Sequence, residues 1–220
     1  MVDKLLIFDL DGTLADTLTT IRDAVNMCME HFGYPTLDLV KTRRNVGNGV
    51  KLLIEKSLPE SALQREGELE RVLEYFRGCY LKTHDNIDDC YDGLRDIVYE
   101  LKAHGYELAV LSNKPDPLVK NIISKLFDKG TFSVSMGQSE LPRKPDPTVP
   151  LMIAEQLGYT VEQSYFIGDS EVDIATAKNA GMTSVAVTWG FRDREELLLT
   201  RPDVVIDTPS QLREFFRNFE

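Results

Sequence analysis

The sequence predicts a doubly wound parallel α/β sheet that is interrupted by one block of helices. Two observations support this fold class. From about residue 93 onward, short apolar runs alternate with stretches of helical periodicity. Another apolar run, at residues 5–8, comes much earlier, and only helical patterns separate it from the others. Alternating strands and helices favour a parallel sheet with helices on both faces. The early run is therefore expected to join that same sheet.

The first expected element is a buried strand at residues 5–8. Leu5-Leu6-Ile7-Phe8 is continuously apolar, as in parallel strands that are covered on both faces. A helix follows, in which apolar residues recur at helical spacing from Leu18 to Met29 until Gly33-Tyr34-Pro35 ends it.

Further helices are expected next: one starting near Thr36, one over residues 51–57 and one over residues 59–82. No strand pattern appears between residues 16 and 85. The predicted domains are therefore an α/β core of residues 1–15 and 86–220, and an inserted helical cap domain of residues 16–85.

The rest of the chain alternates between the two kinds of element. The expected helices are 93–104, 117–127, 147–157 and 171–180, with a terminal helix from 209. The expected strands are 106–111, 131–136, 164–167, 183–188 and 204–206.

The composition limits the classes of partner that the protein is expected to bind. A chain of 220 residues suffices for one large domain or for a core with an insertion. No apolar run approaches the length that spans a bilayer, and a net charge of −11 argues against general affinity for nucleic acid. An anionic small molecule remains compatible with this charge, because a bound cation inverts the local field.

The cysteines and the start of the chain indicate a compartment. Cys28, Cys79 and Cys90 are odd in number and lack metal-ligand spacing, which fits a reducing environment. Since the first residues lead directly into a core strand, no secretory or transit peptide is expected. We therefore expect a cytoplasmic protein, either a monomer or a homodimer.

The most informative residues follow the first strand. Asp9 and Asp11 stand one residue apart, with Gly12 permitting a turn and Thr13 offering a hydroxyl just beyond it. Side chains at the carboxyl end of such a strand face the crevice where open α/β sheets bind ligands. Two carboxylates there repel each other and are costly to desolvate, so a divalent cation is the simplest compensation.

Polar groups follow two further strands. Ser112 and Asn113 come after one, and Asp169 comes after another with Asp173 four residues on. Lys144 lies in a loop made rigid by Pro145 and Pro147. Taken singly, Asp169 would be an ordinary helix N-cap and Lys144 an ordinary solvated lysine. A parallel sheet brings the carboxyl ends of its strands to one edge, so together these groups predict a site. Hard oxygen ligands such as those of Asp9 and Asp169 suit Mg²⁺.

With these motifs the chain resembles the haloacid dehalogenase superfamily over essentially its whole length. Asp9-Leu10-Asp11-Gly12-Thr13-Leu14 resembles the first motif of the superfamily, and Ser112 the second. Lys144 resembles the third motif, and Gly168-Asp169-Ser170 with Asp173 resembles the fourth.

The resemblance implies a role for each residue. Asp9 would be the nucleophile that forms an aspartyl-phosphate, and Asp11 the general acid/base. Mg²⁺ would be held by the Asp9 carboxylate, the Asp11 backbone carbonyl and Asp169, with Asp173 in support. Mg²⁺, Lys144 and Ser112 would stabilise the charge of the transferring phosphoryl group. The dehalogenase branch attacks carbon and lacks the second aspartate, so Asp11 favours a phosphate substrate.

The insertion resembles the C1 cap of the superfamily, and Val46-Gly47-Asn48-Gly49-Val50 resembles the cap loop of phosphoglycolate phosphatases. Gly47 and Gly49 would let the backbone approach a small ligand closely, and Asn48 offers side-chain hydrogen bonds. Nearby Arg43, Arg44 and Lys51 are candidate partners for a substrate carboxylate. The expected substrate is a small phosphorylated metabolite, with 2-phosphoglycolate as the first candidate. The predicted substrate-binding residues are Thr13, Gly47, Asn48, Gly49, Ser112 and Asn113.

Other functions share these motifs. A β-phosphoglucomutase-like enzyme needs a phosphosugar-binding cap, for which no signal is present. A pyrophosphatase of the same superfamily stays open. A phosphonatase needs a Schiff-base lysine in the cap, and nothing marks Lys41, Lys51 or Lys56 as desolvated. A non-catalytic binding protein would be expected to lose at least one of the acidic or lysine residues named above, and all are present.

Overall fold

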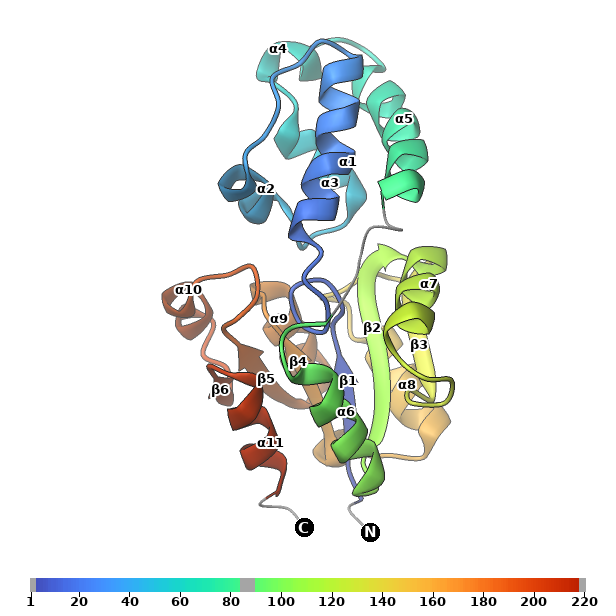
Figure 1. Cartoon of the computed structure of the whole chain (residues 1–220), viewed down its shortest axis with the longest axis vertical. Helices are drawn as coiled ribbons and strands as arrows, with labels where there is room; N and C mark the ends of the chain where they lie inside the picture. The colour runs from blue at the N-terminus through green and yellow to red at the C-terminus, as the bar shows by residue number, and fades with distance from the viewer. Residues whose placement is uncertain (1–2, 84–89, 218–220) are drawn as a thin grey trace. The chain divides into compact units, whose positions relative to one another are not determined.

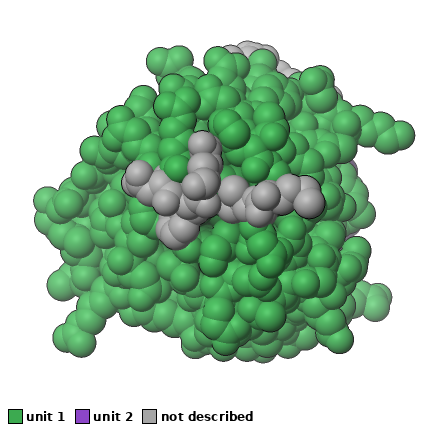
Figure 2. Space-filling model, turned by 90° about the horizontal axis from the view of Figure 1, so that it is seen from below, with its two compact units in different colours: residues 1–16, 89–220 green, residues 17–88 purple. Residues whose placement is uncertain are grey.

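The computed structural model describes residues 3–83 and 90–217. The chain divides into two compact units, residues 1–16 with 89–220 and residues 17–88. We call them the core unit and the helical unit; Figure 2 shows one face of the core unit in green. The sequence-predicted boundary between residues 85 and 86 falls within residues 84–89, outside the described residues.

The core unit is built on one parallel sheet of six strands in the order β3-β2-β1-β4-β5-β6 (Figure 1). The predicted doubly wound α/β fold class is therefore confirmed. The strands are β1 (Leu5–Phe8), β2 (Glu107–Pro115), β3 (Val134–Gln138), β4 (Ser164–Gly168), β5 (Thr183–Val187) and β6 (Val204–Ile206).

Helices cover both faces of this sheet, as Figure 1 shows. On one face, α8 and α9 pack over apolar strand residues such as Ile7 and Phe166, which are fully buried. On the other face lie α6 and α11, where the rings of Tyr106 and Phe216 meet edge to face at 5.4 Å. The helices of this unit are α6 (Leu94–Ala103), α7 (Asp116–Leu126), α8 (Thr148–Leu157), α9 (Glu171–Ala180), α10 (Arg194–Leu199) and α11 (Pro209–Arg217), with a short 3₁₀ helix, η2 (Val161–Gln163).

The strand order reverses between β1 and β4. From β1 the chain fills one side of the sheet with β2 and β3, and it returns to the other side of β1 with β4. Phe8 lies beside Ile167, and the Asp9 N–H donates to the Ile167 carbonyl at 2.9 Å. The carboxyl ends of two strands whose connections diverge leave a crevice in which α/β proteins bind ligands. Asp9 and Asp169 both lie at this point.

Several elements of the core unit differ from prediction, among them β2, β3 and α10. Strand β2 continues to Pro115, because its backbone pairs again with β3 at Gln138 after a register shift. Strand β3 starts at Val134, because Thr131 is held in a turn by its N–H donating to the Asp128 carbonyl at 3.1 Å. The short helix α10 was not predicted, although a capping box between Asp193 and Glu196 marks its start.

The helical unit contains α1 (Leu18–His31), α2 (Leu39–Asn45), α3 (Val50–Ser57), α4 (Glu60–Leu63) and α5 (Glu68–Thr83). Its core forms where α1 packs against α5, with Val25, Cys28, Val72 and Phe76 buried. The helix predicted over residues 59–82 is two helices, because Gly67 adopts a left-handed conformation with φ of 74° and breaks the periodicity. Within the described residues, no helix has both the length and the apolar character needed to cross a membrane.

Candidate active site

Three buried carboxylates meet at the carboxyl edge of the sheet. Asp9 follows β1, Asp169 follows β4, and Asp173 lies in the first turn of α9. One carboxylate oxygen from each lies within 4.8 Å of the others. Asp169 and Asp173 are each 1 % exposed and Asp9 is 7 % exposed. Burial of three like charges at this distance is costly unless bound protons or nearby cations compensate them.

Lys144 supplies one of these cations. Its Nζ lies 2.8 Å from Asp9 Oδ1 and 2.6 Å from Asp173 Oδ1. Burial lowers the pKa of Lys144, but the charges of Asp173 and Asp9 outweigh it and leave the pKa above its usual range. The ammonium group is therefore charged at neutral pH.

The loop that carries Lys144 is held by Asn113. The Asn113 amide donates to the Lys144 carbonyl at 3.2 Å, and its oxygen accepts from the Lys144 N–H at 2.9 Å. The side chain that sequence reasoning assigned to substrate binding thus positions the backbone of the lysine.

Asp173 is held on both of its oxygens. Oδ2 accepts from the Ser170 N–H at 3.1 Å and from the Ser170 hydroxyl at 2.5 Å, while Oδ1 accepts from Lys144. The bond from the Ser170 N–H is one half of the capping box of α9, in which the Ser170 hydroxyl accepts from the Asp173 N–H in return. Asp173 therefore connects the start of this helix to the charged site.

The donors that Asp169 meets among the described residues are neutral. Its Oδ1 accepts from the Thr13 hydroxyl at 3.0 Å, and its Oδ2 accepts from the Phe191 N–H at 2.7 Å. Within the described part of the chain it forms no ion pair with a lysine or arginine. Burial, together with the charges of Asp173 and Asp9, raises the pKa of Asp169 to about 8. Burial likewise raises the pKa of Asp9 to about 6, against the opposing effect of Lys144.

Asp11 forms a separate ion pair with Lys114. Lys114 Nζ lies 2.9 Å from Asp11 Oδ1, and the two side chains are 1 % and 13 % exposed. Lysines are almost never fully buried unless they are paired. Sequence analysis did not select Lys114, although its position two residues after Ser112 was a signal that could have placed it at the same edge.

The remaining predicted residues fall into two groups. Thr13 and Ser112 are buried in the core unit, and the Ser112 hydroxyl accepts from the Lys114 N–H at 3.4 Å. Gly47, Asn48 and Gly49 belong to the helical unit, where both glycines have positive φ values, of 120° and 82°. The position of that loop relative to Asp9 stays a prediction.

The donor set suits a divalent cation. Asp169 forms no ion pair within the described residues, and Asp9 Oδ1, although close to Lys144, accepts no hydrogen bond of good geometry there. Carboxylate oxygens are the ligands that Mg²⁺ prefers, and it is usually bound through one or two carboxylates together with substrate phosphate. Asp9 and Asp169 therefore fit this ion.

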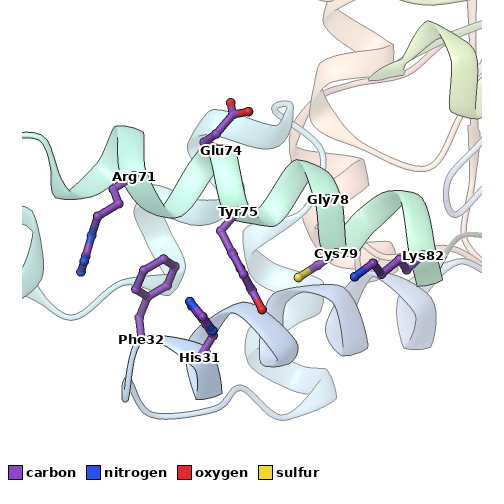
Figure 3. Close-up of a pocket in the computed structure, with 8 residues that line it drawn as sticks. All are labelled: His31, Phe32, Arg71, Glu74, Tyr75, Gly78, Cys79 and Lys82. Carbon is purple, nitrogen blue, oxygen red and sulfur yellow. The ribbon is translucent and has the colours of Figure 1, made fainter.

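Away from these residues, a hollow of about 660 Å³ lies between α1 and α5 in the helical unit. Figure 3 shows its lining, in which the rings of His31 and Tyr75 stack at 3.9 Å. The Arg71 guanidinium lies 4.6 Å from the centre of the Phe32 ring. None of the predicted site residues lines this hollow.

Comparison with known proteins identifies the family. The model for haloacid dehalogenase-like hydrolases matches residues 6–187. The chain therefore belongs to the haloacid dehalogenase-like hydrolases.

Particular relatives are phosphatases. A phosphoglycolate phosphatase of Pseudomonas putida is 33% identical over 208 residues, which cover 93% of this chain and 76% of the relative. One of Vibrio cholerae is 31% identical over 96% of each chain. The crystal structure of a predicted phosphoglycolate phosphatase from Haemophilus somnus superposes with a TM-score of 0.89 at 28% identity, covering 97% of both chains. The predicted family resemblance and the predicted enzyme class, a phosphoric monoester hydrolase, are both confirmed.

Proposed function

We propose that this protein is a magnesium-dependent phosphatase that hydrolyses a small phosphate monoester, with 2-phosphoglycolate as its substrate. One observation carries the proposal: a buried carboxylate triad at the carboxyl edge of the sheet lies against Lys144 and includes an aspartate that forms no ion pair within the described residues. The choice of substrate rests on the phosphoglycolate phosphatases among the relatives.

In this proposal Asp9 is the nucleophile. One of its carboxylate oxygens attacks the phosphorus atom, and the bond from phosphorus to the ester oxygen breaks. Asp11 gives a proton to that departing oxygen, so the leaving group departs as an alcohol. Covalent catalysis of this kind divides one difficult displacement into two easier ones.

The second step restores the enzyme. A water molecule attacks the phosphorus of the aspartyl-phosphate and gives its proton to Asp11. The bond between phosphorus and the Asp9 oxygen breaks, which releases inorganic phosphate and regenerates the carboxylate. General acid–base catalysis of this kind contributes about 10²–10⁴-fold.

The other residues bind and orient the phosphoryl group. Mg²⁺, held by Asp9, the Asp11 carbonyl and Asp169 with support from Asp173, would neutralise charge on the phosphoryl oxygens. Lys144 adds a fixed positive charge beside Asp9, from which its Nζ lies 2.8 Å away.

Substrate contacts are proposed for Thr13, Ser112, Asn113 and the Gly47–Gly49 loop. The Thr13 hydroxyl and the Asn113 amide already bond to Asp169 and Lys144. These two residues therefore also support the groups that face the phosphate.

A phosphomutase is the second candidate. A β-phosphoglucomutase from Clostridium difficile superposes with a TM-score of 0.78, but at 21% identity this similarity shows the fold alone. No contact in the described residues favours a phosphosugar, a pyrophosphate or a phosphonate. Location in the cytoplasm and a monomeric or homodimeric state also remain predictions.

The test is a panel of phosphorylated metabolites, assayed for phosphate release with Mg²⁺ and with excess chelator. We expect the highest kcat/KM for 2-phosphoglycolate, loss of activity with chelator and recovery when Mg²⁺ is restored. Activity that survives chelation would overturn the metal assignment. Preference for a sugar phosphate, with phosphate moved rather than released, would favour the mutase.

A further inference from the structure

The segment between β5 and α10 contacts the proposed metal ligand Asp169 directly, and none of its residues was predicted as part of the site. The Phe191 N–H donates to Asp169 Oδ2 at 2.7 Å, and the Thr13 hydroxyl donates to Oδ1 at 3.0 Å. Phe191 follows β5 and Thr13 follows β1. Because the two oxygens are held from separate elements, the carboxylate cannot turn without losing a hydrogen bond.

Two glycines enclose the same side chain. A β-carbon on Gly12 would collide with the Asp169 carboxylate, and one on Gly190 would collide with both the Asp169 side chain and the Gly12 carbonyl oxygen. Gly190 is not among the glycines with positive φ, so this position requires a glycine for space and not for backbone conformation. Asp169 therefore lies between two backbone segments and has no room to move sideways.

The indole of Trp189 ties these segments together. Its Nε1–H donates to the Thr13 carbonyl at 3.1 Å, which joins the segment after β5 to the turn after β1. Trp189 is also the single tryptophan of the chain. Tryptophan emission of this protein therefore reports on the surroundings of Trp189, the residue two before Phe191.

We propose that Trp189, Gly190 and Phe191 are positioning residues that hold Asp169 rigid and thereby make the site select Mg²⁺ over Ca²⁺. This inference rests on the magnesium site of the proposed function. Mg²⁺ binds oxygen at about 2.1 Å in near-ideal octahedral geometry, whereas Ca²⁺ needs about 2.4 Å and more ligands. A carboxylate enclosed by two backbones cannot withdraw to admit the larger ion. Selectivity between these ions depends on cavity size and flexibility.

The experiment measures cation binding without substrate. The full-length protein is titrated with Mg²⁺ and with Ca²⁺ in a calorimeter, as wild type, Gly190→Ala and Gly78→Ala. Tryptophan emission is followed in parallel. Gly78 is the matched control, because a β-carbon there meets no heavy atom within 4 Å and its φ is not positive.

We expect wild type to bind Mg²⁺ more tightly than Ca²⁺, with a change in tryptophan emission. Gly190→Ala should weaken Mg²⁺ binding by about 10–100-fold, the usual effect of removing support behind a metal ligand. Its ratio of Mg²⁺ to Ca²⁺ affinity should also fall. Gly78→Ala should behave as wild type.

A second variant covers the case in which Gly190→Ala does not fold. Trp189→Phe keeps an aromatic ring and removes only the indole donor, so it should shift the Mg²⁺ to Ca²⁺ ratio in the same direction by a smaller factor. This inference alone is overturned if folded Gly190→Ala keeps the wild-type ratio of Mg²⁺ to Ca²⁺ affinity. If Gly190→Ala does not fold, the same result in Trp189→Phe overturns it. Absence of Mg²⁺ binding in wild type would overturn the magnesium site of the proposed function, and this inference with it.

Discussion

At the scale of single residues, the site is organised by which carboxylate is paired with which cation. Lys144 lies between Asp9 and Asp173, and Lys114 pairs with Asp11. Asp169 is left with neutral donors. This unequal distribution separates the proposed acid/base, which has its own lysine, from the side of the site where a cation is expected.

The Asp9→Asn variant tests the proposed nucleophile. The amide has nearly the same volume as the carboxylate, so the fold should be retained. An amide is neither an effective nucleophile nor a strong ligand for Mg²⁺, so turnover should be lost. Phosphate release and far-ultraviolet circular dichroism check the two expectations. Activity near that of wild type would rule out the covalent mechanism.

The Lys114→Met variant tests the ion pair that sequence reasoning missed. Removing the buried Lys114 ammonium takes a cation away from the Asp11 carboxylate, whose side chain is 13 % exposed, and should cost more than about 1 kcal/mol of unfolding free energy. The matched control is Lys120→Met, because Lys120 pairs with Asp116 at 2.8 Å but is 63 % exposed. Loss of this exposed pair should cost under about 1 kcal/mol.

Urea denaturation of both variants and of Asp11→Asn/Lys114→Met provides the measurement. The double variant should recover part of the loss, because the Asp11 carboxylate has been neutralised together with the lysine. If Lys114→Met is no less stable than Lys120→Met, the pair with Asp11 does not stabilise the core unit.

Sequence reasoning found the residue types of this site but not their pairings. Asp9, Asp169 and Asp173 come together because parallel strands bring their carboxyl ends to one edge, a rule that needs no coordinates. The contacts of Phe191 and Trp189 depend on how the loop after β5 folds back across that edge. No periodic pattern in the sequence predicts the path of a loop. Lys114 was missed because an apolar strand pattern ends at the first polar residue, whereas β2 continues through Lys114 to Pro115.

At the scale of elements, the sequence predicts the bounds of a helix or strand best where it carries a clear signal at both ends. Strand β6 and helix α9 have the predicted bounds, because an apolar run or a capping residue marks each end. The predicted helix over residues 59–82 failed at Gly67, where a single positive φ interrupts a sequence that is otherwise periodic. A break of this kind depends on the backbone angle of one residue. Helical periodicity is judged over many residues and therefore does not detect it.

The loop before α3 carries the prediction at this scale. Gly47 and Gly49 hold positive φ values on either side of Asn48, a conformation that lets backbone approach a small ligand. Replacing Asn48 by Ala should therefore raise KM or lower kcat for 2-phosphoglycolate. Turnover of an aryl phosphate should change much less, because its reactivity depends less on contacts away from phosphorus.

Steady-state kinetics on both substrates makes this comparison. Equal losses of activity on both substrates would mean that the loop supports the fold and does not select the substrate. No loss on either would remove the loop from the substrate site.

At the scale of the whole molecule, the buried acids couple folding to pH and to metal. Burial raises the pKa of Asp9 to about 6 and that of Asp169 to about 8, from an ordinary value of 3.8. The folded protein therefore holds more protons than the unfolded chain between about pH 4 and pH 8. In the absence of metal, the contribution of these two groups to stability must decrease as pH rises through that window.

Thermal unfolding with chelator and with Mg²⁺ tests this coupling. With chelator, Tm should fall between about pH 5 and pH 8, because both carboxyls lose protons that the fold favours. Mg²⁺ binds the folded state and competes with those protons, so the Tm gain from Mg²⁺ should be small near pH 5 and larger near pH 8. In Asp169→Asn, the fall in Tm should be shallower and the gain from Mg²⁺ smaller, since the group with the higher pKa has been removed. A Tm that rises over this range in chelator, or an Mg²⁺ effect that is equal at both pH values, would contradict this coupling. It would mean that burial does not raise the pKa values of Asp9 and Asp169 in the metal-free protein.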